Sequence, residues 1–372
     1  MIKRLTTKYP SVKRRSLRLG FVPLTDCAPL LMARELGLFR KYGLSVQLSR
    51  ELGWATIRDK IIYRELDAAH AVAGMPFATT LGLGSIRCEC LTGLVLNLQG
   101  NAITLASELW RQGVRDGTTL RAEIVRVSRR KTFTFGVVFP YSSHHFLLRD
   151  WLAAAGIHPD RDVRIVVVPP PQMVANLKAG HLDGFCVGEP WNSVAVQMRA
   201  GWCVATSAEL APGHPEKVLI VRREFAESCE ADHLALVAVL LEACEYCAQP
   251  ENCAHVVDTL ARPEHVGAPT AALRRVFDGN FDFGHGRVES LPDFTLFHRH
   301  DANEPSDAKA AWVMGHLRQS GLYRENHSLD VALGREVFRK DLFEKAHALC
   351  NSSNSELENE NEIKSETELA SV

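Results

Sequence analysis

The chain has 372 residues, of which 46% are hydrophobic and 23% are charged, and its formal net charge at pH 7 is −1. This balance is that of an ordinary globular protein, and it argues against nucleic acid or an anionic membrane as the main partner. No stretch approaches the roughly 20 apolar residues that span a bilayer, and the length indicates two lobes rather than a single core.

The first residues form a basic extension, 1–16, and no apolar signal-peptide core follows it. This pattern predicts a cytoplasmic chain, or a periplasmic one if the start codon is misassigned. Cysteines at the spacings Cys88-x-Cys90 and Cys244-x-x-Cys247 are of a type that binds metals. The second pair lies in a strongly apolar segment, however, so we expect buried thiols there and no metal.

Strand and helix patterns then alternate along most of the chain. Extended segments are expected at 18–22, 44–48, 68–72, 95–104, 133–139, 163–168, 182–187 and 218–221, and helices at 26–43, 54–62, 142–156 and 172–179. This order predicts an α/β protein with mostly parallel sheets covered by helices on both faces. Ligands of such sheets bind beyond the carboxyl ends of the strands.

A polar turn, 139–145, stands between one expected strand and one expected helix. Ser142 and Ser143 are good N-cap residues, so the free N–H groups and the positive end of the helix dipole face the end of the strand. His144 adds a donor that can carry charge near neutral pH. The pattern fits an anion site, and equally a satisfied cap with a surface histidine.

Other turns at strand ends also carry glycine, proline and polar residues. They are Leu24-Thr25-Asp26, Gly74-Met75-Pro76, Gln99-Gly100-Asn101, Pro169-Pro170-Pro171, Gly188-Glu189-Pro190-Trp191 and Pro215-Glu216-Lys217. Glycine and proline fix turns and let the backbone approach a ligand. The series therefore predicts a set of loops that line a cleft.

Several motifs in this order resemble the nitrate/bicarbonate-binding proteins of ABC transporters. The quoted stretches are LRLGFVPLTDCAPLLMARELGLFRKYGLSV, GWATIRDKI, DAAHAVAGMPFATTLGLG, LNLQGNAITL, FPYSSHHFLLRDWLAAAGI, PPPQMVANLKAGHLDGFCVGEPW and HPEKVLIVRREF. The resemblance implies a two-lobed periplasmic-binding-protein type II fold that traps a small oxyanion between its lobes. It divides the chain into 17–105 as the first part of lobe 1, 106–210 as lobe 2, 211–346 as the completion of lobe 1, and an acidic tail, 347–372, expected to be disordered.

The same resemblance implies five ligand-binding residues, which are Trp54, Gln99, His144, Pro170 and Lys217. A Lys at the last position goes with nitrate in this family, whereas a Glu there goes with bicarbonate and a calcium ion. The chain is therefore expected to bind nitrate or nitrite without a metal or other cofactor. The chemistry agrees, because nitrate is planar and singly charged and needs one positive charge, directed donors and a flat wall.

Two roles remain open for such a receptor. It is either the substrate-binding component that serves an ABC transporter permease and ATPase, or a cytosolic sensor that holds an RNA-binding antiterminator inactive until nitrate or nitrite arrives. The short beginning of the chain looks more like the sensors. The alternatives are a receptor for another anion such as bicarbonate, and an enzyme of the thiamine-pyrimidine synthase type, which shares the fold. We expect no enzyme, because the sequence has no G-x-S-x-G motif and no glycine-rich phosphate loop. Asp26 and His144 could form an acid/base pair, but nothing in the sequence places them in contact.

Overall fold

The computed structural model describes residues 15–323 and 329–351, which build two lobes around two mixed sheets. The larger sheet has the order β14-β5-β11-β3-β1-β2, with β4 paired to β11, and the smaller has the order β10-β6-β9-β7-β8. The larger sheet contains β1 (Leu17–Phe21), β2 (Val46–Arg50), β3 (Ala68–Val72), β4 (Cys90–Leu91), β5 (Val95–Gln99), β11 (Pro215–Arg222) and β14 (Thr295–Leu296). The smaller contains β6 (Asn101–Ala106), β7 (Phe133–Val137), β8 (Val163–Val167), β9 (Gly184–Gly188) and β10 (Gly201–Thr206).

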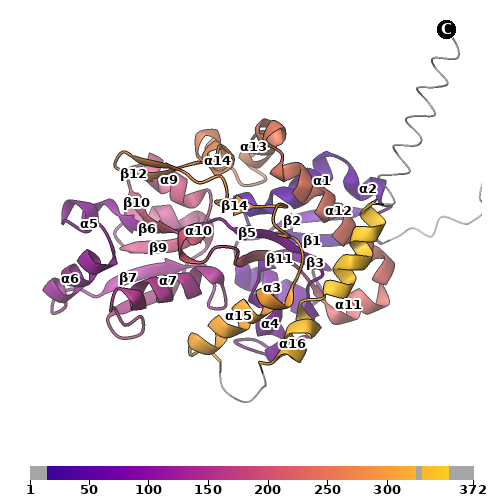
Figure 1. Cartoon of the computed structure of the whole chain (residues 1–372), viewed down its shortest axis with the longest axis horizontal. Helices are drawn as coiled ribbons and strands as arrows, with labels where there is room; N and C mark the ends of the chain where they lie inside the picture. Colours follow the sequence, from indigo (N-terminus) through magenta and orange to yellow (C-terminus); the bar gives the residue numbers. More distant parts are fainter. Residues whose placement is uncertain (1–14, 324–328, 352–372) are drawn as a thin grey trace, which may run out of the picture.

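Helices cover both sheets, and Figure 1 shows the smaller lobe in magenta to the left of the larger one. Around the larger sheet lie α1 (Ala28–Glu35), α2 (Leu38–Lys41), α3 (Trp54–Ile62), α4 (Met75–Leu81), α11 (Arg223–Ser228), α12 (Glu230–Ala248) and α13 (Cys253–Ala261). Around the smaller sheet lie α5 (Ser107–Arg111), α6 (Gly117–Val127), α7 (Ser143–Ala154), α8 (Met173–Lys178), α9 (Trp191–Gln197) and α10 (Ser207–Leu210). The described residues also form three short 3-10 helices, which are η1 (Thr25–Cys27), η2 (Pro170–Gln172) and η3 (Pro250–Asn252).

The sheets are mixed, and not mostly parallel as the alternation of elements predicted. β1 pairs in parallel with β2 and β3, and β7 with β8 and β9. β11, by contrast, runs antiparallel to β3, β4 and β5, and β6 antiparallel to β9 and β10. The antiparallel strands are those that carry the chain from one lobe to the other and back, which a local βαβ pattern does not reveal.

The chain crosses between the lobes twice, once between β5 and β6 and once between β10 and β11. The first crossing comes at Gln99 and Gly100, which both take positive φ angles, 61° and 94°. The change of sheet therefore falls before the boundary predicted at residue 105, because the backbone reverses at this pair and splits the expected strand 95–104 in two. The expected helix 26–43 is likewise broken, since Gly37 takes a φ of 71° between α1 and α2.

The C-terminal part, predicted to complete lobe 1 and to form a helical segment, also contacts the smaller lobe. It contains α14 (Thr270–Phe277), β12 (Asn280–Gly284), β13 (Arg287–Ser290), α15 (Asp307–Gln319) and α16 (Val331–Val337). In the β12–β13 hairpin, His285 stacks on Trp110 of the smaller lobe with ring centres 4.0 Å apart. On α15, His316 Nε2 lies 3.0 Å from an oxygen of Asp150 on α7.

The end of the chain departs from prediction as well. A helix runs from residue 340 to residue 351, so the first residues of the expected tail, 347–351, are helical. Leu342, Ala346 and Cys350 recur at helical spacing and are buried, which explains why the helix persists. The remainder of the predicted tail, 352–372, and most of the basic extension, 1–14, lie outside the described residues. In the described part, no helix is both long and apolar enough to cross a bilayer.

Candidate anion site between the lobes

A fully buried lysine is the centre of the candidate site. Lys217 lies near the start of β11 between β3 and β5, where its backbone neighbours are Val72 and Asn97. Its Nζ is 2.7 Å from Oδ2 of Asp26 and 2.5 Å from Oε1 of Glu216. Burial alone would lower the pKa of Lys217, but these carboxylates outweigh it and raise the pKa, so the ammonium is charged.

The carboxylate of Asp26 joins this lysine to a histidine and an aromatic wall. Asp26 lies in η1, directly after β1, and its Oδ1 is 2.8 Å from Nε2 of His70 on β3. Burial would raise the pKa of Asp26, but Lys217 and His70 outweigh it and lower the pKa. The ring of His70 lies 5.2 Å from that of Trp54, and Lys217 Nζ is 5.5 Å from the Trp54 ring centre. The ammonium is thus within cation–π range of the indole.

Trp54 begins α3 and is buried with its polar atom unpaired. Its side chain is 1% exposed, and its Nε1 has no hydrogen-bond partner. A buried N–H group without a partner costs free energy, so native proteins nearly always provide one. The unpaired indole N–H of Trp54 lies near the buried ammonium of Lys217 and could donate a hydrogen bond to an anion bound there.

The helix α7 brings His144 to the same place. Ser142 caps α7 through its side chain, as the sequence predicted, and His144 follows in the first turn. His144 is fully buried, neither ring nitrogen has a hydrogen-bond partner, and Nε2 lies 3.4 Å from Oε1 of Glu216. Burial lowers the pKa of His144 to about 4, although Glu216 opposes the shift, so its imidazole is neutral at pH 7.

Glu216 connects the two lobes at this point. From the smaller lobe it accepts hydrogen bonds from Asn101 Nδ2, at 2.5 Å, and from the hydroxyl of Ser143. From the second crossing, His214 Nε2 approaches its Oε2 to 3.3 Å. Burial would raise the pKa of Glu216, but Lys217 and the histidines outweigh it and hold the pKa well below its usual range. The side chain is therefore a carboxylate that draws groups of both lobes together.

The two remaining predicted residues have other surroundings. The amide of Gln99 is occupied by backbone groups, because Nε2 donates to the carbonyl of Asp293 at 2.6 Å and Oε1 accepts from Gly213 N at 3.0 Å. Pro170 is buried at the start of η2, and its neighbour Pro169 lies beside Gly53, the residue that precedes Trp54. The structure therefore brings Trp54, His144 and Lys217 together, and the turn that contains Pro170 lies next to them. Gln99 instead bonds to backbone groups at the first crossing between the lobes.

Sequence reasoning did not identify most of the polar groups of this cluster as partners of one another. His70 stands inside the apolar strand β3, and Asn101, His214 and Glu216 each lie next to a turn that was noted only as cleft-lining. Asp26 was predicted to lie in a cleft-lining turn and to be a possible acid/base partner of His144, whereas its carboxylate bonds to Lys217 and His70. A charged or polar residue inside an otherwise apolar strand was the available signal.

The two thiols of the Cys244-x-x-Cys247 pair are core residues, whereas in the other pair Cys90 is buried and Cys88 is half-buried. Cys244 and Cys247 are buried in α12, and burial raises the pKa of both. Among residues 15–323 and 329–351, no three His, Cys, Asp or Glu side chains are arranged to hold a metal ion. Cys27, next to Asp26, is also buried with a raised pKa, so the cluster offers a cation, N–H donors and an aromatic wall but no thiolate nucleophile.

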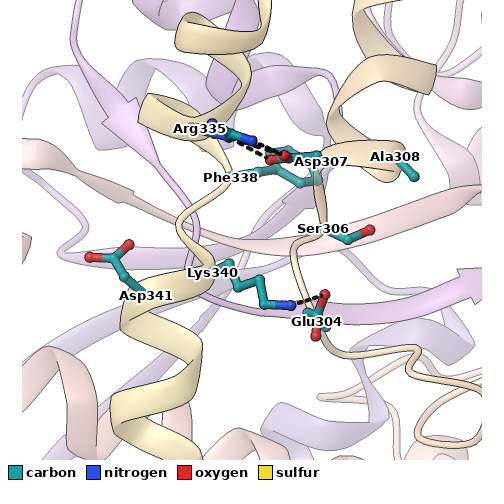
Figure 2. Close-up of a pocket in the computed structure, with 8 residues that line it drawn as sticks. All are labelled: Glu304, Ser306, Asp307, Ala308, Arg335, Phe338, Lys340 and Asp341. Atoms are coloured by element: carbon teal, nitrogen blue, oxygen red, sulfur yellow. Dashed lines mark hydrogen bonds and ion pairs between the residues drawn. The ribbon is translucent and has the colours of Figure 1, made fainter.

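A separate cavity of about 520 Å³ lies on another part of the larger lobe, as Figure 2 shows. Its lining residues are Glu304, Ser306, Asp307, Ala308, Arg335, Phe338, Lys340 and Asp341. It shares no residue with the buried cluster. Arg335 and Asp307 pair across it at 2.7 Å, and Lys340 and Glu304 at 3.0 Å, so its charged groups already satisfy one another.

Two α/β lobes, crossed twice by the chain and joined by a buried polar cluster, define the class of periplasmic-binding-protein-like receptors. The crystal structure of the periplasmic nitrate-binding protein NrtA from Synechocystis PCC 6803 matches with a TM-score of 0.86 and 28% identity, over 90% of this chain and 88% of NrtA. The alkanesulfonate-binding protein SsuA from Xanthomonas axonopodis pv. citri matches with a TM-score of 0.63 and 17% identity, over 88% of this chain and 97% of SsuA, which shows the fold alone.

The chain belongs to the NMT1-like family, whose sequence profile matches residues 11–261. The nitrate/nitrite binding protein NrtA of Nostoc sp. is 32% identical over 357 residues, which cover 94% of this chain and 80% of NrtA. The nitrate import ATP-binding protein NrtC of Synechocystis sp. is 43% identical over 338 residues, 90% of this chain and 50% of NrtC. The bicarbonate transport ATP-binding protein CmpC of Synechococcus elongatus is 37% identical over 319 residues, 85% of this chain and 47% of CmpC. The chain thus spans about half the length of NrtC and CmpC, and the expected fold and family are confirmed.

Proposed function

We propose that this chain binds nitrate or nitrite between its two lobes and that closure of the lobes is its output. One observation carries the proposal: the indole N–H of Trp54 and both ring nitrogens of His144 are buried without hydrogen-bond partners near the fully buried ammonium of Lys217. A small planar anion would accept from these donors and lie against the indole face. Glu216, which bonds to groups of both lobes, would make the same site sensitive to lobe closure.

Binding rather than catalysis is the activity that this site supports. Its thiol is buried and protonated, its lysine is held by two carboxylates, and Asp26 and His144 do not form an acid/base pair. The similar proteins named above are binding and transport proteins, which supports the same choice. The family resemblance implies Pro170 and Gln99 as further ligand-binding residues. Pro170 is kept as such a proposal, whereas we propose a structural role for Gln99, because both atoms of its amide bond to backbone groups.

The proposed partners follow from the similar proteins. The match to half of NrtC supports a role beside the ATPase and permease of a nitrate ABC transporter. The sensor role, with an RNA-binding antiterminator as partner, and the cytoplasmic location stay predictions from the sequence. Affinity capture with the purified chain distinguishes the two, because a transporter complex and an RNA-binding regulator differ in size and composition.

Isothermal titration of the full chain against nitrate, nitrite and bicarbonate, in metal-free buffer, tests the ligand. We expect micromolar binding of nitrate or nitrite, which corresponds to about 8 kcal/mol, and no comparable binding of bicarbonate. Calcium-dependent binding of bicarbonate alone would contradict the proposal and favour the activity that the name of CmpC describes.

A further inference from the structure

In the proposed site, the positive charge of Lys217 is already balanced by carboxylates. What we infer from this rests on the function proposed above. The ammonium of Lys217 lies between two carboxylates, at 2.7 Å from Asp26 and 2.5 Å from Glu216. These three side chains together carry one net negative charge. An anion that enters beside them adds a second negative charge to a buried cluster, where unbalanced charge is costly.

We propose that the anion binds together with one proton, and that the imidazole of His144 takes this proton up. His144 is fully buried, both of its ring nitrogens lack hydrogen-bond partners, and Nε2 lies 3.4 Å from Oε1 of Glu216. A neutral imidazole has one N–H, whereas an imidazolium has two. Between Glu216 and a bound anion, only the imidazolium donates to both.

The other groups that face His144 are already committed. Asp26 and Lys217 bond to each other, and the second oxygen of Asp26 receives His70 at 2.8 Å. His214 turns one ring nitrogen to the carbonyl of Ala211 at 2.8 Å and the other to Glu216 at 3.3 Å. Asp26, Lys217 and His214 therefore already have protein partners, whereas neither ring nitrogen of His144 has a hydrogen-bond partner.

The next residue on α7, His145, is turned elsewhere and serves as a control. Its Nδ1 lies 2.7 Å from the carbonyl of Pro140, five residues before it in the chain. Burial lowers the pKa of His145 to about 4, as it does for His144. The two histidines are thus adjacent in sequence, both are buried, and burial lowers the pKa of both. They differ in that only His144 faces Glu216 and the proposed anion.

The pH dependence follows from linkage. The free protein holds His144 neutral, because its pKa is lowered to about 4. A bound anion beside the ring raises this pKa, so the complex holds one proton more than the free protein at every pH between the two values. Affinity is therefore highest at low pH and falls by about tenfold for each pH unit within that window.

Titration of the full chain with nitrate and with nitrite, in phosphate, Hepes and Tris buffers at one pH, measures the proton directly. The observed enthalpy plotted against the ionisation enthalpy of the buffer has a slope equal to the protons exchanged. We expect an uptake of about one proton, and a Kd that rises about tenfold between pH 6 and pH 7. Binding with no proton uptake, or binding that requires an added divalent cation, would overturn the proposal. An absence of heat with both nitrate and nitrite in all three buffers would overturn the proposed function and this inference with it.

Two variants assign the proton to a residue. His144→Gln keeps an amide donor but cannot titrate, so we expect weaker binding with a proton count near zero and a flat pH profile. His145→Gln, one residue away, should keep a count of about one. A count that stays near one in folded His144→Gln would place the proton elsewhere and overturn the assignment.

Discussion

Two lysines of this chain each lie beside a carboxylate, one inside the molecule and one on its surface. Lys217 is 0% exposed and has Asp26 at 2.7 Å. Lys340 is 51% exposed and has Glu304 at 3.0 Å, in the cavity drawn in Figure 2. The distances are similar, but water can solvate the second pair and cannot reach the first. Burial, and not the contact distance, separates the two regions energetically.

The same contrast explains why the cavity of Figure 2 is the weaker candidate for a ligand site. Around Lys340, the charged groups pair with one another, as Arg335 does with Asp307. Around Lys217, the indole N–H of Trp54 and both ring nitrogens of His144 have no partner. Buried donors without partners indicate that something else accepts from them. Unpaired buried groups that gather around one buried charge therefore locate this site better than empty volume does.

Removal of the buried ammonium should have the largest effect. We expect Lys217→Met to weaken nitrate or nitrite binding by more than about 100-fold, roughly 2.7 kcal/mol, because the positive charge of the site is lost. The variant should also melt at lower temperature, since Asp26 and Glu216 are left without a countercharge. Titration calorimetry and circular dichroism measure the two effects. Lys340→Met is the matched surface control, and equal binding by the two variants would remove the distinction between the regions.

Removal of a single unpaired donor should have the next largest effect. Trp54→Phe keeps the aromatic wall and loses the N–H, so we expect affinity to fall by about tenfold. Stability should change little, because that N–H has no partner in the folded protein. Trp202→Phe is the control, since the Nε1 of Trp202 is also buried and unpaired but lies in the core of the smaller lobe. Equal losses of affinity in both variants would mean that Trp54 acts through packing.

Local sequence signals predicted part of the fold and of this site. Ser142 and the strand before it placed α7 and thus His144, and the family resemblance gathered Trp54 and Lys217 beside it. The antiparallel pairing of β11 was not predictable in this way, because it depends on where the chain returns from the other lobe. The bonds of Asp26 to His70 on β3 were equally hidden, since nothing within β3 marks that histidine as a partner.

Gln99 was predicted as a ligand residue, and its surroundings suggest a structural role that is testable. The partner of its Nε2, the carbonyl of Asp293, lies 194 residues away in the chain, beyond the reach of any local pattern. Gln99→Ala removes this bond and the one from Gly213, which should lower the free energy of unfolding by about 1–3 kcal/mol. We expect affinity to change by less than about threefold. Gln112→Ala, at the exposed residue that follows the end of α5, controls for loss of an amide. A large loss of affinity at unchanged stability would instead support the role that the resemblance implies.

The smallest effect is expected in the cavity of Figure 2. Arg335 and Asp307 are joined at 2.7 Å, yet their side chains are 68% and 55% exposed. Because water and salt screen such pairs, Arg335→Ala should leave the Kd for nitrate unchanged and shift the melting temperature by no more than about 2 °C. Thermal melts at low and high salt measure this, and Asp307→Asn should behave alike. A marked, salt-sensitive loss of binding in either variant would show that this charged surface is coupled to the site. The exposure of a lysine side chain would then not distinguish Lys217 from Lys340 as a determinant of anion binding.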